Sequence, residues 1–146
     1  GSEPDIFLLT FGNGDPVIKS DLQHLNIGHV ENDFILSLLY NAADVFVISS
    51  LEEAFGLTAL EAISCGIPVV GFDTGGIPDM IENGITGYLT ETGNIAGLAE
   101  TINRALKLSE KDYIKMANNC REKVLSGFTI SQQAEKYVKV YSQLLN

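Results

Sequence analysis

The strongest constraint on the fold is a set of short apolar runs in which polar residues do not alternate with apolar ones. Continuous runs of this kind are typical of strands buried on both faces, as in a parallel sheet covered by helices. Three runs are clear, and two weaker ones lie close to glycines. The clear runs are residues 6–11, 45–48 and 67–70, and the weaker ones are residues 27–30 and 86–89.

Helical periodicity fills the spaces between these runs. Apolar residues recur at helical spacing over residues 34–42 and 57–63, and Gly66 is well suited to end the second of these helices. A further short helix is expected to carry Pro78 in its first turn. The alternation of strands and helices predicts an α/β fold with an open parallel sheet.

After residue 92 the pattern is helical only. The first expected helix is capped by Asn94, the second runs from about Ser109 to Leu125, and the third from about Ser131 to Leu145. No repeat or interior linker interrupts the chain. The sequence therefore predicts one domain whose sheet is followed by a C-terminal helical tail.

Charge is distributed unevenly along the chain. The net charge is −10, and Lys19 is the only Lys or Arg before Arg104. Binding to a nucleic-acid backbone or an anionic membrane needs clustered cations, so neither is expected as a partner. The basic residues after Arg104 recur on amphipathic helices, which indicates a solvated face.

The two cysteines point to a reduced compartment. Cys65 and Cys120 fit neither a metal-binding spacing nor a disulfide framework, which favours a cytoplasmic setting and small buried thiols.

His24 has no partner in sequence and is expected at the surface. No apolar run is long enough for a membrane helix. Gly1-Ser2, without a Met, is typical of a cloning remnant.

Three loops are candidate ligand sites, because open parallel sheets bind ligands beyond the carboxyl ends of their strands. The loop at residues 12–14 lacks the third glycine of a dinucleotide fingerprint, so an ordinary turn is expected there. The loop at residues 73–76 pairs Gly75 with Gly76 before a short helix. These glycines either make a tight turn or offer backbone amides to a diphosphate.

The loop at residues 49–56 carries the richest chemistry. Two carboxylates precede a helix whose free N–H groups and dipole favour an anion, and Gly56 allows a ligand to approach the backbone. Glu61 leans back toward this helix start, and Glu53 faces it from the loop. The alternative is that Glu52 and Glu53 only complement the helix dipole while Glu61 is solvated.

A longer series of motifs includes this loop. The motifs are YNAADVFV at residues 40–47, Glu53-x7-Glu61, CGIPVV at residues 65–70, FDTGGIPD at residues 72–79 and NGITGYL at residues 83–89. Together they resemble the C-terminal, donor-binding half of retaining glycosyltransferases of family 4, which have the GT-B fold. The likeness is dense from about Phe34 to Ala105.

The resemblance implies a Rossmann-like domain, with helices on both faces of its sheet, that binds a nucleotide-sugar. It assigns Glu53 as the catalytic residue that contacts hydroxyls of the donor sugar, and Glu61 as the partner of the ribose hydroxyls. The other candidate donor-binding residues are Phe55, Gly56, Leu57, Gly75, Gly76, His29 and Val30. The first three offer amides to the sugar and diphosphate, the two glycines belong to the third loop, and the last two lie near the base. No metal and no cofactor is expected.

In the intact enzyme the expected reaction is transfer of a sugar to an acceptor hydroxyl with retention, in polysaccharide or glycoconjugate synthesis. The acceptor is expected to be a saccharide or a lipid-linked molecule bound by a separate N-terminal domain. The enzyme is expected in the cytoplasm, either free or peripheral at the inner face of the membrane. Two alternatives remain open: a sugar-nucleotide epimerase or phosphorylase-like enzyme on the same fold, and a non-enzymatic flavodoxin-like binding module.

The sequence departs from the family pattern at its start. Family members carry a basic pair on the strand and helix that begin this half, and here only the remnant precedes Glu3. Residues 3–146 are therefore expected to be a donor-binding domain that lacks the acceptor domain and its own first strand–helix unit. Lys19 is not assigned to the missing role. By itself the chain is expected to bind donor feebly and to transfer nothing.

Overall fold

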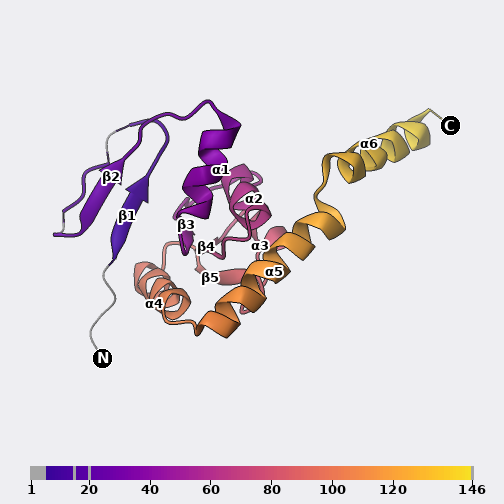
Figure 1. Cartoon of the computed structure of the whole chain (residues 1–146). Helices are drawn as coiled ribbons and strands as arrows, with labels where there is room; N and C mark the ends of the chain where they lie inside the picture. Colours follow the sequence, from indigo (N-terminus) through magenta and orange to yellow (C-terminus); the bar gives the residue numbers. More distant parts are fainter. Residues whose placement is uncertain (1–5, 15, 20, 146) are drawn as a thin grey trace.

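The computed structural model describes residues 6–14, 16–19 and 21–145, so the expected remnant at Gly1-Ser2 lies outside the described residues. Strands and helices alternate from β2 to β5 and are followed by helices alone, as predicted, but in the described residues no helix separates β1 from β2 (Figure 1). The strands are β1 (Phe7–Thr10), β2 (Gln23–Asn26), β3 (Phe46–Ile48), β4 (Val69–Asp73) and β5 (Gly87–Glu91). The helices are α1 (Asp33–Asn41), α2 (Leu57–Ser64), α3 (Ile77–Met80), α4 (Ile95–Leu106), α5 (Glu110–Gly127) and α6 (Ile130–Leu144).

All the described strand pairs are parallel, as the continuous apolar runs predicted. The strands fall into two sheets, one of β1 and β2 and one in the order β3-β4-β5. Within the described ranges no ladder joins β1 to β3, so the expected sheet is divided at this point. The small sheet lies to one side of the larger one (Figure 1).

The predicted strand at residues 27–30 is wrong. The second strand ends at Asn26, which pairs with Thr10 at the end of β1. Beyond it Gly28 has a φ of +75°, and its carbonyl accepts a hydrogen bond from the Gly12 N–H at 2.8 Å. This left-handed residue turns the chain away from the ladder, and only glycine adopts it without strain.

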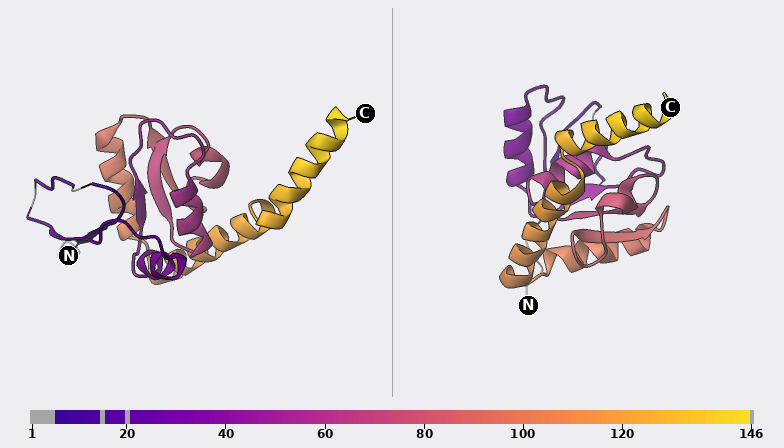
Figure 2. Two further views of the ribbon diagram at one scale, coloured as in Figure 1. Left: turned by 90° about the horizontal axis from the view of Figure 1, so that it is seen from above. Right: turned by 90° about the vertical axis from the view of Figure 1, so that its right-hand side faces the viewer.

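The larger sheet is covered on both faces, as expected for a parallel sheet. Val69 and Val70 are neighbours on β4 and point to opposite sides. Val69 packs in a cluster with buried residues of α2 and with Cys120 of α5, whereas Val70 packs with Ala105 of α4. Figure 2 shows helices on both sides of this sheet.

The helix boundaries lie close to the predicted ones. Asn94 caps α4 by accepting the Gly97 N–H, and Pro78 lies in the first turn of α3. Gly66 follows α2 with a φ of +82°, in agreement with its predicted role at the helix end.

The last helix, α6, extends away from the rest of the molecule (Figures 1 and 2). It begins with a capping box in which the Thr129 and Gln132 side chains bond each other's backbone N–H groups. None of its described residues is buried. Its exposed apolar residues are Ile130, Tyr137, Val138, Val140, Tyr141 and Leu144.

Candidate functional site

Two of the three predicted ligand loops lie against each other. The Thr74 hydroxyl of the 73–76 loop donates to the Leu51 carbonyl of the 49–56 loop at 3.2 Å. A Cβ on Gly75 would overlap the carbonyl oxygen of Glu53, and a Cβ on Gly76 would lie 3.0 Å from the Cα of Phe55. Gly75 therefore allows a backbone-to-backbone contact that a side chain would block, and a Cβ at Gly76 would require the backbone of Phe55 to shift slightly.

Glu53 is half-buried at the start of α2. Its Oε1 accepts a hydrogen bond from the Gly56 N–H at 3.2 Å. Gly56 has a φ of +88°, and a Cβ there would lie 3.2 Å from Cγ1 of Ile77 on α3. The loop backbone thus orients the Glu53 carboxylate at the mouth of the helix, where the predictions put it.

The first turn of α2 is open. Apart from Glu53, which accepts from the Gly56 N–H, no side chain in the described part of the chain accepts from the N–H groups of this turn, and Leu57 and Thr58 are exposed. The first N–H groups of a helix have no intrahelical acceptor, and the helix dipole adds a partial positive charge there. Phe55 borders this turn, with its ring centroid 6.4 Å from that of Phe128 at the end of α5. The arrangement can receive a negatively charged group.

Glu61 is half-buried on α2 and is held by a tyrosine. The Tyr40 hydroxyl donates to its Oε2 at 2.8 Å, and Tyr40 itself is only 2% exposed. Burial raises the pKa of Tyr40, and the hydrogen bond and negative charge of Glu61 raise it further. The alternative in which Glu61 is simply solvated does not fit this geometry. Its role toward a ribose stays a prediction.

His29 and Val30 lie beyond the end of β2. The Gly12–Gly28 hydrogen bond attaches this segment to the 12–14 loop. The side chain of His29 is 57% exposed, with Nε2 at 3.9 Å from Oε1 of Glu31, and Val30 is half-buried. The role of both residues near a base stays a prediction.

The expectation for His24 is wrong. It is half-buried, and its Nε2 lies 2.9 Å from the Thr10 hydroxyl. The parallel register of β1 and β2 aligns residue 8 with residue 24 and residue 10 with residue 26, so Thr10 and His24 share one face. Sequence spacing alone does not reveal a pairing that depends on this register.

Sequence reasoning gave no function to Tyr40 or Thr74. Tyr40 belongs to a motif that carried the family resemblance, and Thr74 belongs to the third loop. The signal that could have singled out Tyr40 is its position on the apolar stripe of α1, because a buried tyrosine hydroxyl needs a polar partner.

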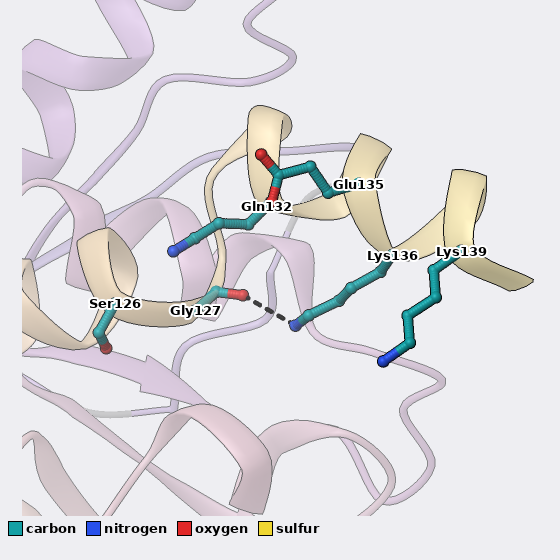
Figure 3. A pocket seen from close by; sticks show the side chains of 6 residues that line it. All are labelled: Ser126, Gly127, Gln132, Glu135, Lys136 and Lys139. Carbon is teal, nitrogen blue, oxygen red and sulfur yellow. Dashed lines mark hydrogen bonds between the residues drawn. The ribbon is translucent and has the colours of Figure 1, made fainter.

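Two hollows of about 240 Å³ each lie outside this site, and neither is lined by Glu53 or Glu61. One lies between the end of α5 and α6, where the Lys136 ammonium donates to the Gly127 carbonyl at 3.2 Å (Figure 3). The other lies at the carboxyl ends of β1 and β2. Its lining residues are Thr10, Phe11, Asn13, Gly14, Pro16 and Asn26.

The cysteines are free. Cys120 is buried, as predicted, and donates to the Thr86 carbonyl at 3.3 Å; burial raises the pKa of its thiol to about 12. Cys65 is half-buried, and burial raises its pKa too.

Among the described residues no three His, Cys, Asp or Glu side chains form a group that could hold a metal ion. No helix in the described ranges is long and apolar enough to span a membrane.

Known proteins are similar to this chain in sequence and in fold. The family described as glycosyl transferases group 1 matches residues 19–124. The N-acetyl-alpha-D-glucosaminyl L-malate synthase of Bacillus anthracis is 35% identical over 152 residues, which cover 99% of this chain and 39% of that protein.

Two solved structures agree with the sequence match. Sucrose-phosphate synthase from Thermosynechococcus elongatus has a TM-score of 0.80 and 29% identity, over 94% of this chain and 38% of that one. Anabaena HepE in complex with UDP has a TM-score of 0.74 and 26% identity, over 83% of this chain and 32% of that one. The chain thus spans about two fifths or less of each of these proteins. It belongs to the glycosyl transferases group 1 family.

Proposed function

We propose that the protein transfers a sugar from a nucleoside-diphosphate-sugar to an acceptor hydroxyl, with retention, as its family 4 resemblance implies. The observation that carries the proposal is the Glu53 carboxylate, bonded to the Gly56 N–H at the open mouth of α2. The UDP bound to Anabaena HepE makes UDP the first nucleotide to test.

In this proposal the donor lies across the start of α2. The backbone N–H groups of Phe55 and Leu57 contact the sugar and diphosphate, while the Gly56 N–H, which donates to Oε1 of Glu53, holds that carboxylate beside them. Gly75 and Gly76 support this contact, because their close packing holds the backbone of the opposite loop. His29 and Val30 lie near the base, and Glu61 accepts hydrogen bonds from the ribose hydroxyls.

The chemistry needs charge stabilisation at two points. The bond from the anomeric carbon to the diphosphate breaks, a bond to the acceptor oxygen forms, and the proton of the acceptor hydroxyl passes to the departing diphosphate. Glu53 positions the sugar hydroxyls and stabilises positive charge at the anomeric carbon, while the α2 N–H groups stabilise the departing diphosphate. The proposal uses no metal and no further cofactor.

Cations for the diphosphate are the part of the site that these loops do not supply. None of the nine Lys and Arg residues of the sequence lies at residues 12–14, 49–56 or 73–76. Arg121, on α5, is bonded to the Cys65 carbonyl at the opposite end of α2. The proposal therefore expects basic groups from another part of the whole protein, together with the groups that bind a saccharide or lipid-linked acceptor.

The proposed setting is the cytoplasm, in the synthesis of a polysaccharide or glycoconjugate. The two free cysteines suit a reduced compartment. The family match favours a transferase over a flavodoxin-like binding module.

Calorimetry on the full-length protein tests the donor site. UDP, GDP and ADP are titrated into wild type, Glu61→Ala and the control Glu110→Ala, which changes an exposed acid at the start of α5. The proposal predicts that at least one nucleoside diphosphate binds, that Glu61→Ala weakens its binding, and that Glu110→Ala does not. Absence of binding, or equal effects of the two variants, would contradict it.

A further inference from the structure

The hydrogen bond between Tyr40 and Glu61 joins a core residue to a predicted ligand residue. Tyr40 is 2% exposed on α1, and Glu61 is half-buried on α2, yet the hydroxyl reaches the carboxylate at 2.8 Å. Burying a carboxylate even in part is costly unless a donor satisfies it. The bond therefore stabilises Glu61 in one orientation.

Two further rings hold Tyr40. The centroids of Phe11 and Phe46 each lie 5.4 Å from that of Tyr40, and both pairs are edge-to-face. Edge-to-face packing restricts the ring. The direction of the Tyr40 hydroxyl is thus set by the core and not by any ligand.

The Tyr40 hydroxyl keeps its proton. Burial and the neighbouring Glu61 both raise its pKa, so it remains a hydrogen-bond donor at every physiological pH. One oxygen of Glu61 is therefore occupied by a permanent donor from the core.

The other carboxylate oxygen is available. Within the part of the chain that the structure describes, Oε1 of Glu61 accepts no hydrogen bond, and it is not a buried unsatisfied atom. A carboxylate has about four lone-pair sites, so Glu61 can accept from ligand hydroxyls while it stays bonded to Tyr40.

We propose that Tyr40 is a positioning residue, which fixes the Glu61 carboxylate so that it distinguishes a ribonucleotide from a deoxyribonucleotide in the donor. This inference rests on the proposed function and extends it to a residue that does not touch the ligand. A free glutamate side chain loses rotamer freedom when it binds, whereas a fixed one has already lost it.

The test uses UDP and 2′-deoxy-UDP with the full-length protein. Calorimetry gives the Kd of both nucleotides for wild type, Tyr40→Phe, Glu61→Ala and the double variant. Tyr88→Phe is the matched control, because Tyr88 is likewise buried, at 4% exposure, but packs under Arg104 on the other face of the sheet. Thermal unfolding checks that each variant is folded.

Tyr40→Phe is expected to raise the Kd for UDP by about 3- to 10-fold, from the ordering of one side chain. The ratio of the two Kd values should fall toward one in Tyr40→Phe and in Glu61→Ala, and should stay at the wild-type value in Tyr88→Phe. In the Glu61→Ala background, Tyr40→Phe should raise the Kd for UDP by less than about twofold, because the two residues act as one unit.

Three results would overturn the inference. Tyr40→Phe could leave the ratio unchanged, it could weaken binding equally with and without Glu61, or wild type could bind the two nucleotides equally. In each case UDP binding itself survives, so the failure is separate from that of the proposed function. If wild type binds no UDP, both fail.

If Tyr40→Phe does not fold, a crystal structure of the wild-type protein with UDP decides the question. The inference predicts that Tyr40 still donates to Glu61 and that the second carboxylate oxygen accepts from a ribose hydroxyl. A Glu61 side chain that leaves Tyr40 in order to reach the ribose would contradict it.

Discussion

Gly75 lies on the peptide carbonyl of Glu53, so close that a Cβ at position 75 would overlap the carbonyl oxygen. The contact joins the two loops that follow β3 and β4. Because the Glu53 side chain is in turn bonded to the Gly56 N–H, the packing at Gly75 determines where the proposed catalytic carboxylate lies.

Gly75→Ala should displace the Glu53 loop. Gly75 has a φ of +54°, so the change adds backbone strain to the overlap, at a cost of about 2 to 4 kcal/mol of unfolding free energy. Gly84→Ala is the matched control, since Gly84 also has a positive φ but has nothing within 4 Å of its Cβ position. Denaturant unfolding should show a larger loss of unfolding free energy for Gly75→Ala than for Gly84→Ala, and calorimetry should show a larger loss of UDP affinity. Equal losses in the two variants would mean that the contact with Glu53 is unimportant.

The two carboxylates of the site should differ in their kinetic effects. Glu53→Ala should lower kcat by about a hundredfold or more, as expected when an electrostatic group is lost from a transition state. Glu61→Ala should mainly raise the KM for the donor. Steady-state kinetics of the full-length protein measures both, and near-wild-type kinetics of Glu53→Ala would refute its assignment.

Arg121 should matter for stability and not for catalysis. Its guanidinium donates to the Cys65 carbonyl at 2.7 Å, at the C-terminus of α2, where a cation also favours the helix dipole. Arg121→Ala should lower the unfolding free energy by about 1 kcal/mol, whereas Lys115→Ala, at an exposed position on the same helix, should change it little. Denaturant unfolding gives both values; a fall in kcat with unchanged stability would contradict this role.

Stability should fall at alkaline pH. The thiol of Cys120 has a pKa of about 12 in the folded protein against 9.0 for the free group, so the folded state holds this proton more tightly. The contribution of Cys120 to the unfolding free energy is complete below pH 9.0. It is lost as the pH rises toward about 12, at up to about 1.4 kcal/mol per pH unit.

Tyr40, Cys65 and Tyr113 have raised pKa values and act in the same direction. Denaturant unfolding at several pH values on either side of pH 9.0 measures the effect. The stability difference between wild type and Cys120→Ala should narrow as the pH rises. A constant difference would mean that Cys120 does not contribute to the alkaline loss.

Most of the fold follows from local sequence signals. The apolar runs predict strands, Asn94 predicts a helix start and Gly66 predicts a helix end. Each of these signals acts within a few residues along the chain. The error at residues 27–30 has a different cause. An apolar run next to a glycine fits either a strand or the turn after it, and the register with β1 decides between them.

The candidate site likewise contains some features that local sequence predicts and others that only the packing of the fold creates. The spacing of Glu53, Gly56 and Glu61 predicts that they lie around the start of one helix, because the first two immediately precede the helix and Glu61 lies within its second turn. The pairing of Tyr40 with Glu61 and of Thr74 with Leu51 brings together residues about twenty positions apart. Such contacts depend on how the helices and loops pack, which local patterns do not encode.

The central claim, that Glu53 supports retaining sugar transfer, is tested most directly by following the anomeric proton of a UDP-sugar by ¹H NMR. The full-length protein is incubated with UDP-glucose or UDP-N-acetylglucosamine and a panel of saccharide and hydroxy-acid acceptors. We expect wild type to form a product whose anomeric configuration matches that of the donor, and Glu53→Ala to form it far more slowly. An inverted product, or equal rates for the two proteins, would contradict the claim.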